Sequence, residues 1–179
     1  KFIGEGDWVI DIGANIGHYT NRLSELVGSE GRVIAFEPIP ATFTHLSENT
    51  QYCRHQNITL INAAASEGAD SVNMTIPDFS TGLKNYYQAS ISEEVGESNI
   101  SVLTFSIDSL QFNHKVSLVK IDAEGHEPEV LRGAKKLLER DMPILIVETV
   151  TDEIRALLLG LGYKDEKYNN SPNIVFRKR

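Results

Sequence analysis

The sequence predicts an α/β fold whose doubly wound sheet is mostly parallel and ends in an antiparallel hairpin. Short apolar runs alternate with segments of helical periodicity along most of the chain, as they do in strand–helix–strand crossovers. Several of these runs are apolar at almost every position, which is typical of strands covered on both faces. Many of them stop at an acidic residue or a glycine, where a turn into the next helix is expected.

The composition favours a folded domain that needs no disulfide. The chain has 179 residues, of which 41% are hydrophobic and 23% are charged. A chain of this length buries about 70% of its unfolded surface on folding. Cys53 is the single cysteine, which fits a reducing compartment. We expect one domain over residues 1–179 and, because the chain begins at Lys1 rather than Met, a piece of a longer polypeptide.

The charge argues against nucleic acid and membranes as partners. Lys and Arg number 17 against 25 Asp and Glu, a formal net charge of −8 that would repel phosphate backbones and anionic lipid surfaces. Apolar runs stay well short of the ~20 residues of a membrane span, and residues 1–8 lack the apolar core of a signal peptide. The sequence therefore predicts a soluble, cytoplasmic protein.

The first half of the chain predicts two strand–turn–helix units and a third strand. Residues 8–12 form an apolar run that Gly13 stops, and a helical stripe then leads from Ile16 to Gly28, a common helix-closing residue. The remaining elements are a strand at 32–36, a helix from about Thr42 that carries Phe43 and Leu46, and a strand at 58–61.

The middle of the chain does not follow this alternation of strand and helix patterns. Residues 72–76 and 103–107 alternate between apolar and polar positions, which predicts exposed antiparallel strands. Between them, residues 78–98 are polar and aperiodic, so we expect a mobile loop that contacts a substrate.

Regular alternation then resumes to the end of the chain. A strand is expected at 118–121, one helix opened by Pro128 with an apolar stripe from Val130 to Leu138, and a strand at 144–147. A helix from Ile154 to Gly160 and a hairpin with its turn at 169–172 complete the prediction.

Acidic residues stand at the ends of predicted strands and should converge. They are Asp11, Glu37, Asp122 and Glu148. In open parallel sheets ligands bind outside the carboxyl ends of the strands, so these acids would line one crevice. Alternatively, each acid caps a helix or faces water. Lys120, if buried, would need Asp122 or Glu148 as an ion-pair partner.

The first turn fits an adenosine-containing ligand. Gly13 and Gly17 permit a tight turn before a helix N-terminus, and Glu37 lies about where dinucleotide folds place an acid for ribose hydroxyls. The middle glycine that admits a pyrophosphate is replaced by Asn15. Asp11 would attract a cationic cofactor, and S-adenosylmethionine is one.

These residues and a second block resemble a known family. The turn 11–17, the segment 35–38 and the segments 120–127 (Lys-Ile-Asp-Ala-Glu-Gly-His-Glu) and 131–134 are similar to the FkbM family of S-adenosylmethionine-dependent methyltransferases. The resemblance extends from Gly6 to about Tyr163 and is weakest at 78–98. It implies the Rossmann-like fold of class I methyltransferases.

The resemblance also implies roles for individual residues. Glu37 would hold the ribose hydroxyls, and Ala64 and Ser66 would lie near adenine. The residues that would border the methionine part of S-adenosylmethionine are Asp11, Gly13, Asn15 and Gly17. Asp122 would end its strand beside the methyl group.

The catalytic candidates are Asp122, Glu124 and His126. Methyl transfer is an in-line displacement that needs alignment and, for a hydroxyl acceptor, a base, but no metal. His126 titrates near neutral pH and could take the proton, while Asp122 or Glu124 orients the acceptor. Alternatively, His126 is a surface or capping residue at a helix start.

We therefore expect an enzyme that methylates a hydroxyl of a small molecule, by family precedent a sugar or a secondary metabolite. Two alternatives remain. One is an NAD(P)-dependent oxidoreductase, which the missing middle glycine disfavours. The other is a non-catalytic module that binds the cofactor without turnover.

Overall fold

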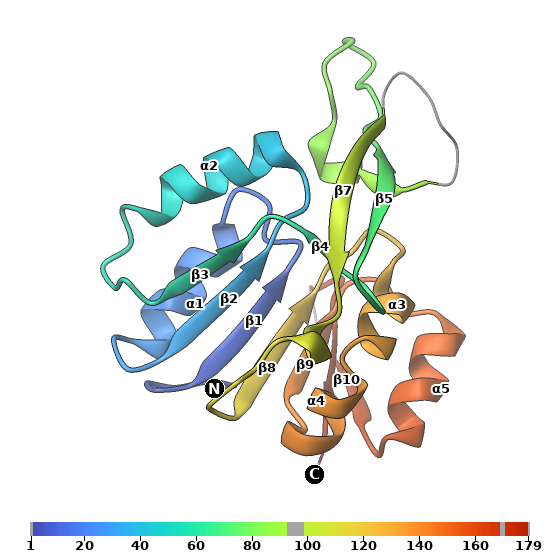
Figure 1. Ribbon diagram of the computed structural model, residues 1–179. Helices are drawn as coiled ribbons and strands as arrows, with labels where there is room; N and C mark the ends of the chain where they lie inside the picture. Colours follow the sequence, from blue (N-terminus) through green and yellow to red (C-terminus); the bar gives the residue numbers. More distant parts are fainter. Residues whose placement is uncertain (1, 93–98, 169–170, 179) are drawn as a thin grey trace.

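The larger sheet has the strand order β10-β11-β9-β8-β1-β2-β3 (Figure 1). The computed structural model describes residues 2–92, 99–168 and 171–178. The strands are β1 (Trp8–Ile12), β2 (Arg32–Phe36), β3 (Ile58–Ile61), β8 (Val116–Ile121), β9 (Ile144–Val147), β10 (Lys164–Lys167) and β11 (Ile174–Arg177). Neighbours from β3 to β9 pair in parallel, and β11 pairs antiparallel with β9 and β10. The predicted doubly wound sheet and its hairpin are confirmed, although residues 169–170 of the predicted turn lie outside the described residues.

The central strands are buried on both faces, as their apolar runs predict. Ile10, Phe36 and Leu145 are fully buried, and Ile12 of β1 pairs in register with Phe36 of β2 and Ile121 of β8. The sheet order reverses between β1 and β8. In open α/β sheets the ligand crevice lies at such a reversal, at the carboxyl ends of the strands.

The helices of the first half, α1 (His18–Val27) and α2 (Pro40–Thr50), pack on each other, and α1 also covers β1 and β2. The predicted start of α1 is wrong by about two residues, and Ile16 and Tyr19 are exposed. The buried stripe instead consists of Thr20, Leu23, Ser24 and Val27. Pro40 opens α2 at its first turn, where a missing N–H is tolerated.

The single helix predicted from Pro128 to Leu138 is wrong, because the chain forms α3 (Glu127–Arg132) and α4 (Lys135–Asp141). At Gly133 between them the backbone lies so close to Ser66 that a Cβ would be 1.9 Å from the Ser66 carbonyl oxygen. The carboxylate of Asp108 accepts hydrogen bonds from the N–H groups of Lys136 and Leu137 at 2.8 and 2.9 Å. These tertiary contacts end one helix and start another. The last helix, α5 (Asp152–Gly160), follows the prediction.

A smaller sheet stands at the carboxyl end of the larger one (Figure 1). Its order is β4-β7-β5-β6, formed by β4 (Ala64–Ala65), β5 (Asp70–Thr75), β6 (Ser90–Ile91) and β7 (Asn99–Phe105), with the short 3-10 helices η1 (Tyr86–Gln88) and η2 (Ile107–Ser109) beside them. The antiparallel pairing of β5 and β7 confirms the predicted antiparallel strands. The predicted bounds 103–107 are wrong, because β7 ends at Phe105 and Ile107 lies in η2. The expected loop at 78–98 contains η1 and β6, and its residues 93–98 lie outside the described part.

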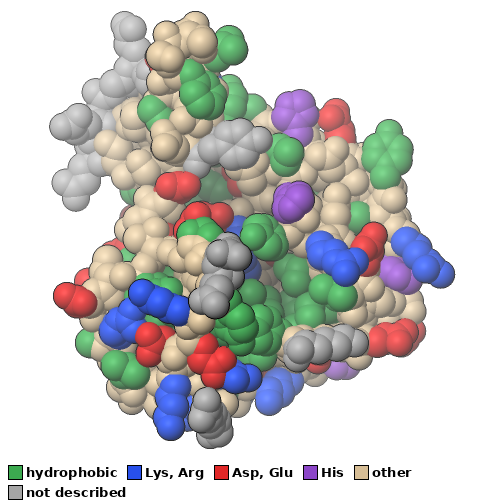
Figure 2. All heavy atoms as spheres, turned by 180° about the vertical axis from the view of Figure 1, so that it is seen from behind, with side chains coloured by type: hydrophobic (Ala, Val, Ile, Leu, Met, Phe, Trp, Pro, Cys, Tyr) green, Lys and Arg blue, Asp and Glu red, His purple; other side chains and the backbone are tan. Residues whose placement is uncertain are grey.

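The surface mixes charges of both signs. On the face shown in Figure 2, acidic and basic side chains are interspersed around apolar ones. Such mixing avoids the single-sign field that attracts nucleic-acid phosphates. Among the described residues, helices lack the length and apolar character needed to cross a membrane.

Candidate active site

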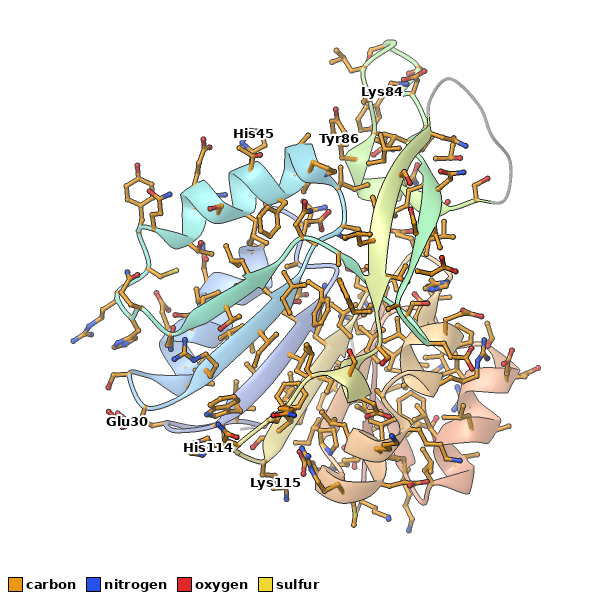
Figure 3. All side chains as sticks on the ribbon, viewed as in Figure 1. Glu30, His45, Lys84, Tyr86, His114 and Lys115 are labelled. Carbon is orange, nitrogen blue, oxygen red and sulfur yellow. The ribbon has the colours of Figure 1, made fainter. Side chains whose placement is uncertain are left out.

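A cavity of about 340 Å³ lies between the carboxyl ends of the larger sheet and the smaller sheet. Its floor includes residues that follow β1, β2, β8 and β9, namely Gly13, Glu37, Asp122 and Glu148. Its roof comes from β5, η1 and β6 and includes Met74, Tyr86, Gln88, Ala89 and Ile91. Tyr86 lies beside the smaller sheet, near the N-terminal end of α2 (Figure 3). The cavity therefore has an acidic floor and a largely apolar roof.

The turn after β1 brings backbone to the cavity floor. Gly13 has φ 70°, and a Cβ there would lie 1.9 Å from the carbonyl oxygen of Asp122, so only glycine fits. The N–H groups of Gly13 and Ala14 both donate to the Phe36 carbonyl, at 3.1 and 2.9 Å. The turn is thus held between β2 and β8, and Asn15 follows it in the left-handed conformation with φ 51°.

Glu37 is a buried carboxylate at the end of β2. Its Oε2 accepts from the N–H of Asn15 and its Oε1 from the N–H of Ile39, both at 2.9 Å. The side chain lines the cavity although the residue is only 4% exposed. Burial outweighs these hydrogen bonds and raises the pKa of Glu37 to about 7. Near neutral pH the group therefore exchanges between the neutral and the ionised form.

Asp11 lies behind the cavity floor and is fully buried. Its Oδ2 accepts from the Thr20 hydroxyl at 2.6 Å, and its Oδ1 is 3.6 Å from the ammonium of Lys120. Lys120 also contacts Asp122 at 3.1 Å and donates to the Gly13 carbonyl at 3.0 Å. The ion pair of Lys120 with Asp122 is one of the two predicted from the sequence. The second partner of Lys120 is Asp11 and not Glu148, the other predicted candidate. One buried ammonium thus joins two carboxylates to the first turn.

Three carboxylates meet at the end of the cavity beside β8. Oxygens of Asp122, Glu124 and Glu148 all lie within 4.8 Å of one another. A hydrogen bond with Asp122, together with burial, raises the pKa of Glu148 to about 7. Burial and the neighbouring Asp122 charge raise the pKa of Glu124. This end of the cavity therefore favours a positive charge.

His126 stands at the edge of the cavity with both ring nitrogens engaged. Its Nε2 is 2.9 Å from the Ser66 hydroxyl, and its Nδ1 is 3.3 Å from Oε2 of Glu129. Partial burial lowers the pKa of His126. Glu127 closes the same turn, because its Oε1 accepts from the N–H groups of Ala123 and Gly125 at 3.2 and 3.3 Å.

The structure brings most of the predicted site residues to one cavity. Its wall includes Gly13, Asn15, Glu37, Ala64, Asp122, Glu124 and His126. Asp11, Gly17 and Ser66 lie behind this wall. Gly17 lets α1 approach α2, since a Cβ there would lie 2.9 Å from Cδ1 of Leu46, and Ser66 supports His126.

The sequence predicted only part of the roof. Tyr86 and Gln88 lie in the segment 78–98, which the sequence predicts to contact a substrate, and both line the cavity. Ile39 and Met74, which also line the cavity, were missed because neither belongs to a catalytic motif. For Ile39 a signal was present, because it follows Glu37 directly into the next helix. For Met74 the period-two pattern predicted a strand, but which sheet face would meet the cavity depends on the long-range pairing of β5 with β6 and β7.

Comparison with known proteins agrees with this architecture. The family model of the methyltransferase FkbM domain matches residues 11–164. The hexuronic acid methyltransferase AglP of Haloferax volcanii is 31% identical over 147 residues, which cover 80% of this chain and 56% of that protein. Methyltransferase 1 of Beauveria bassiana is 25% identical over 147 residues, which cover 72% of this chain and 59% of that protein. The chain thus spans less than two thirds of the length of these relatives.

Solved structures share the fold. The methyltransferase FkbM from Methylobacillus flagellatus superposes with a TM-score of 0.69 at 16% identity, covering 98% of this chain and 44% of that one. Fibrillarin from Aeropyrum pernix, solved with bound S-adenosyl-L-methionine, gives a TM-score of 0.58 at 15% identity and covers 99% of this chain and 68% of that one. The class I methyltransferase fold expected from the sequence is confirmed. The family match over residues 11–164 shows that this chain belongs to the FkbM domain family of S-adenosylmethionine-dependent methyltransferases.

Proposed function

We propose that this chain, as one domain over residues 1–179, transfers a methyl group from S-adenosylmethionine to a hydroxyl of a small, sugar-like molecule. The observation that carries the proposal is the cavity itself. Glu37 stands at one part of its floor, and the carboxylates of Asp122, Glu124 and Glu148 stand at another. An acid for ribose hydroxyls and an acidic end for a sulfonium are the two features that this cofactor requires.

The residues around the first turn fit S-adenosylmethionine. Glu37 would accept hydrogen bonds from the ribose hydroxyls, because each carboxylate oxygen can accept a second bond beside the one from backbone N–H. Because Gly13 packs against the Asp122 backbone without a side chain of its own, backbone alone forms this part of the floor. The further residues proposed to shape the cofactor site are Asp11, Asn15, Gly17, Ala64, Ser66 and Asp122.

When bound, the cofactor would supply a methyl group on a positively charged sulfur, which is ready for in-line displacement. The protein's own contribution is alignment, which is worth up to about 7 to 11 kcal/mol of the barrier. Asp122, fixed by Lys120 at 3.1 Å, would orient the acceptor hydroxyl together with Glu124. We propose that His126, at the cavity edge, is the third residue of the catalytic group and positions the acceptor rather than taking its proton.

A sugar acceptor is supported by the relative that acts on hexuronic acid. Sugar hydroxyls donate hydrogen bonds, and the carboxylates at the acidic end of this cavity accept them. Tyr86, which is exposed on the cavity roof, offers an apolar face to a sugar ring. Gln88 beside it offers a polar group.

The test is transfer of a labelled methyl group. Incubation of the protein with methyl-labelled S-adenosylmethionine and a panel of hexuronic acids, hexosides and other polyols should label at least one acceptor. The transfer should persist in excess EDTA, because alignment needs no metal. Binding of S-adenosylmethionine without label transfer to any acceptor would favour a non-catalytic module. Binding of NADH but not S-adenosylmethionine would favour an oxidoreductase.

A further inference from the structure

The ring of His126 is poorly placed to take a proton from an acceptor. Its Nε2 lies 2.9 Å from the Ser66 hydroxyl and its Nδ1 lies 3.3 Å from Glu129. A general base needs a free lone pair within hydrogen-bond reach of the reacting group. The two contacts occupy both ring nitrogens, so the proton acceptor must be sought among the carboxylates of the same cavity.

Glu148 is fixed beside Asp122 by the sheet. Its backbone N–H donates to the carbonyl of Ile121 at 3.1 Å, which sets the residue after β9 next to the residue after β8. Both side chains line the cavity, and their oxygens and those of Glu124 lie within 4.8 Å of one another. Glu148 itself is exposed toward the cavity and solvent, where an incoming acceptor can reach it.

Resting on the proposed function, we propose that Glu148, beside the Asp122 carboxylate, is the proton acceptor of the transfer and that it gives up its proton when the positive charge of the methyl donor enters the cavity. At pH 7 Glu148 would be partly protonated without the donor and ionised when the donor is bound. Its protonation state would follow the charge of the sulfur.

Electrostatics explains this behaviour. Ionisation of Glu148 is opposed by repulsion from the neighbouring carboxylates. The hydrogen bond with Asp122 raises the pKa of Glu148 to about 7, and Glu124 adds to the rise while Lys120 opposes it. Lys120 is already paired with Asp11 and Asp122, so the excess negative charge remains. A sulfonium nearby would lower the pKa of Glu148 and favour loss of its proton.

The chemical step then balances in charge. The acceptor oxygen forms a bond to the methyl carbon, the carbon–sulfur bond breaks with its electron pair left on sulfur, and the hydroxyl proton passes to the Glu148 carboxylate. The positive charge on sulfur and the negative charge on Glu148 disappear together. The product state therefore holds Glu148 in its protonated form.

Calorimetry measures the proton of Glu148 without any acceptor. Binding of S-adenosylmethionine and of its neutral product S-adenosylhomocysteine is titrated at pH 7 in phosphate and in Tris, whose different ionisation enthalpies report proton release. Both ligands carry the same ribose, so the contribution of Glu37 should cancel. S-adenosylmethionine should release about half a proton more than S-adenosylhomocysteine, since a pKa of about 7 leaves Glu148 half protonated at pH 7.

Substitution assigns the proton to its residue. In Glu148→Gln the extra release should vanish, the affinity for S-adenosylhomocysteine should stay unchanged, and label transfer should fall by about 100- to 10,000-fold. Glu139→Gln removes an exposed carboxylate on α4, outside the cavity wall, and should change none of these quantities. Comparison between wild type and Glu148→Gln also removes any proton that the ligand itself gains or loses.

Each result has a separate meaning. Equal proton release with both ligands in the wild-type protein would overturn this inference, and so would a difference that persists in Glu148→Gln. If the variant does not fold, equal proton release with both ligands in the wild-type protein still overturns the inference. Absence of binding by either ligand would instead overturn the proposed function.

Discussion

The backbone N–H of Asn15 donates to Oε2 of Glu37 at 2.9 Å and so ties the turn after β1 to the end of β2. The other oxygen of Glu37 accepts from Ile39, the N-cap residue of α2. The carboxylate is thus part of the fold, and it also faces the cavity. Its structural and its binding roles are separable by experiment.

Glu37→Ala should weaken binding of S-adenosylhomocysteine by about 10- to 100-fold, because a hydrogen bond to an ionised group contributes about 1.5 to 3 kcal/mol. Titration calorimetry gives the dissociation constant. Thr151→Ala is a matched control, since the Thr151 hydroxyl caps α5 through the N–H of Ile154 at 3.3 Å, away from the cavity. It should cost about 0.5 to 2 kcal/mol of stability with no change in affinity. If Glu37→Ala lowers the stability but leaves the affinity for S-adenosylhomocysteine unchanged, then Glu37 caps the helix and does not bind the ribose.

The affinity for S-adenosylhomocysteine should also depend on pH. Burial raises the pKa of Glu37 to about 7, and the ionised form, which is the better acceptor for ribose hydroxyls, prevails above that pH. Binding should therefore be about tenfold weaker at pH 6 than at pH 8. Glu37→Ala should remove this dependence, and a pH profile that persists in the variant would assign it to another group.

Lys120→Met should destabilise the protein by about 3 to 5 kcal/mol, because it leaves the buried carboxylate of Asp11 without its cation. Denaturant unfolding measures the free energy. The double variant Asp11→Asn/Lys120→Met removes both charges and should be more stable than Lys120→Met alone. A loss below about 1 kcal/mol in the single variant would contradict the pairing.

Gly133→Ala should destabilise the protein by about 1 to 3 kcal/mol or more, since its Cβ would meet the Ser66 carbonyl oxygen at 1.9 Å and backbone cannot swing aside. Gly160→Ala provides the matched control at the end of α5, where a Cβ would find open space. It should stabilise by about 0.5 to 1 kcal/mol through helix propensity. Thermal unfolding of both variants gives the comparison, and equal effects would argue against the contact with Ser66.

Much of the larger sheet could be predicted because short apolar runs in the sequence identify its strands. The runs at 8–12 and 118–121 are apolar except for Asp11 and Lys120, and the structure buries them on both faces. The break between α3 and α4 could not be predicted in the same way. Its causes are the contact of Gly133 with Ser66 and the cap from Asp108. Ser66 and Asp108 both lie in segments that are distant in sequence from the break.

The site was predictable where the chemistry lies in a motif. Glu37, Asp122 and Glu148 follow strands, and parallel strands bring their carboxyl ends to one edge. Asp11 also lies at the end of a strand, but its side chain is buried behind the floor, where it contacts Lys120 and Thr20. The roof residue Met74 reaches the cavity only through the pairing of the smaller sheet, which local periodicity does not specify. Tyr86, by contrast, lies in the segment 78–98 that the sequence predicts beside the substrate.

The most direct test of the account is a crystal structure of the protein with S-adenosylhomocysteine. The account predicts density in the cavity between the two sheets, with both ribose hydroxyls against Glu37 and the sulfur beside Asp122. Density at any other place on the protein, or in the cavity with the ribose turned away from Glu37, would contradict it.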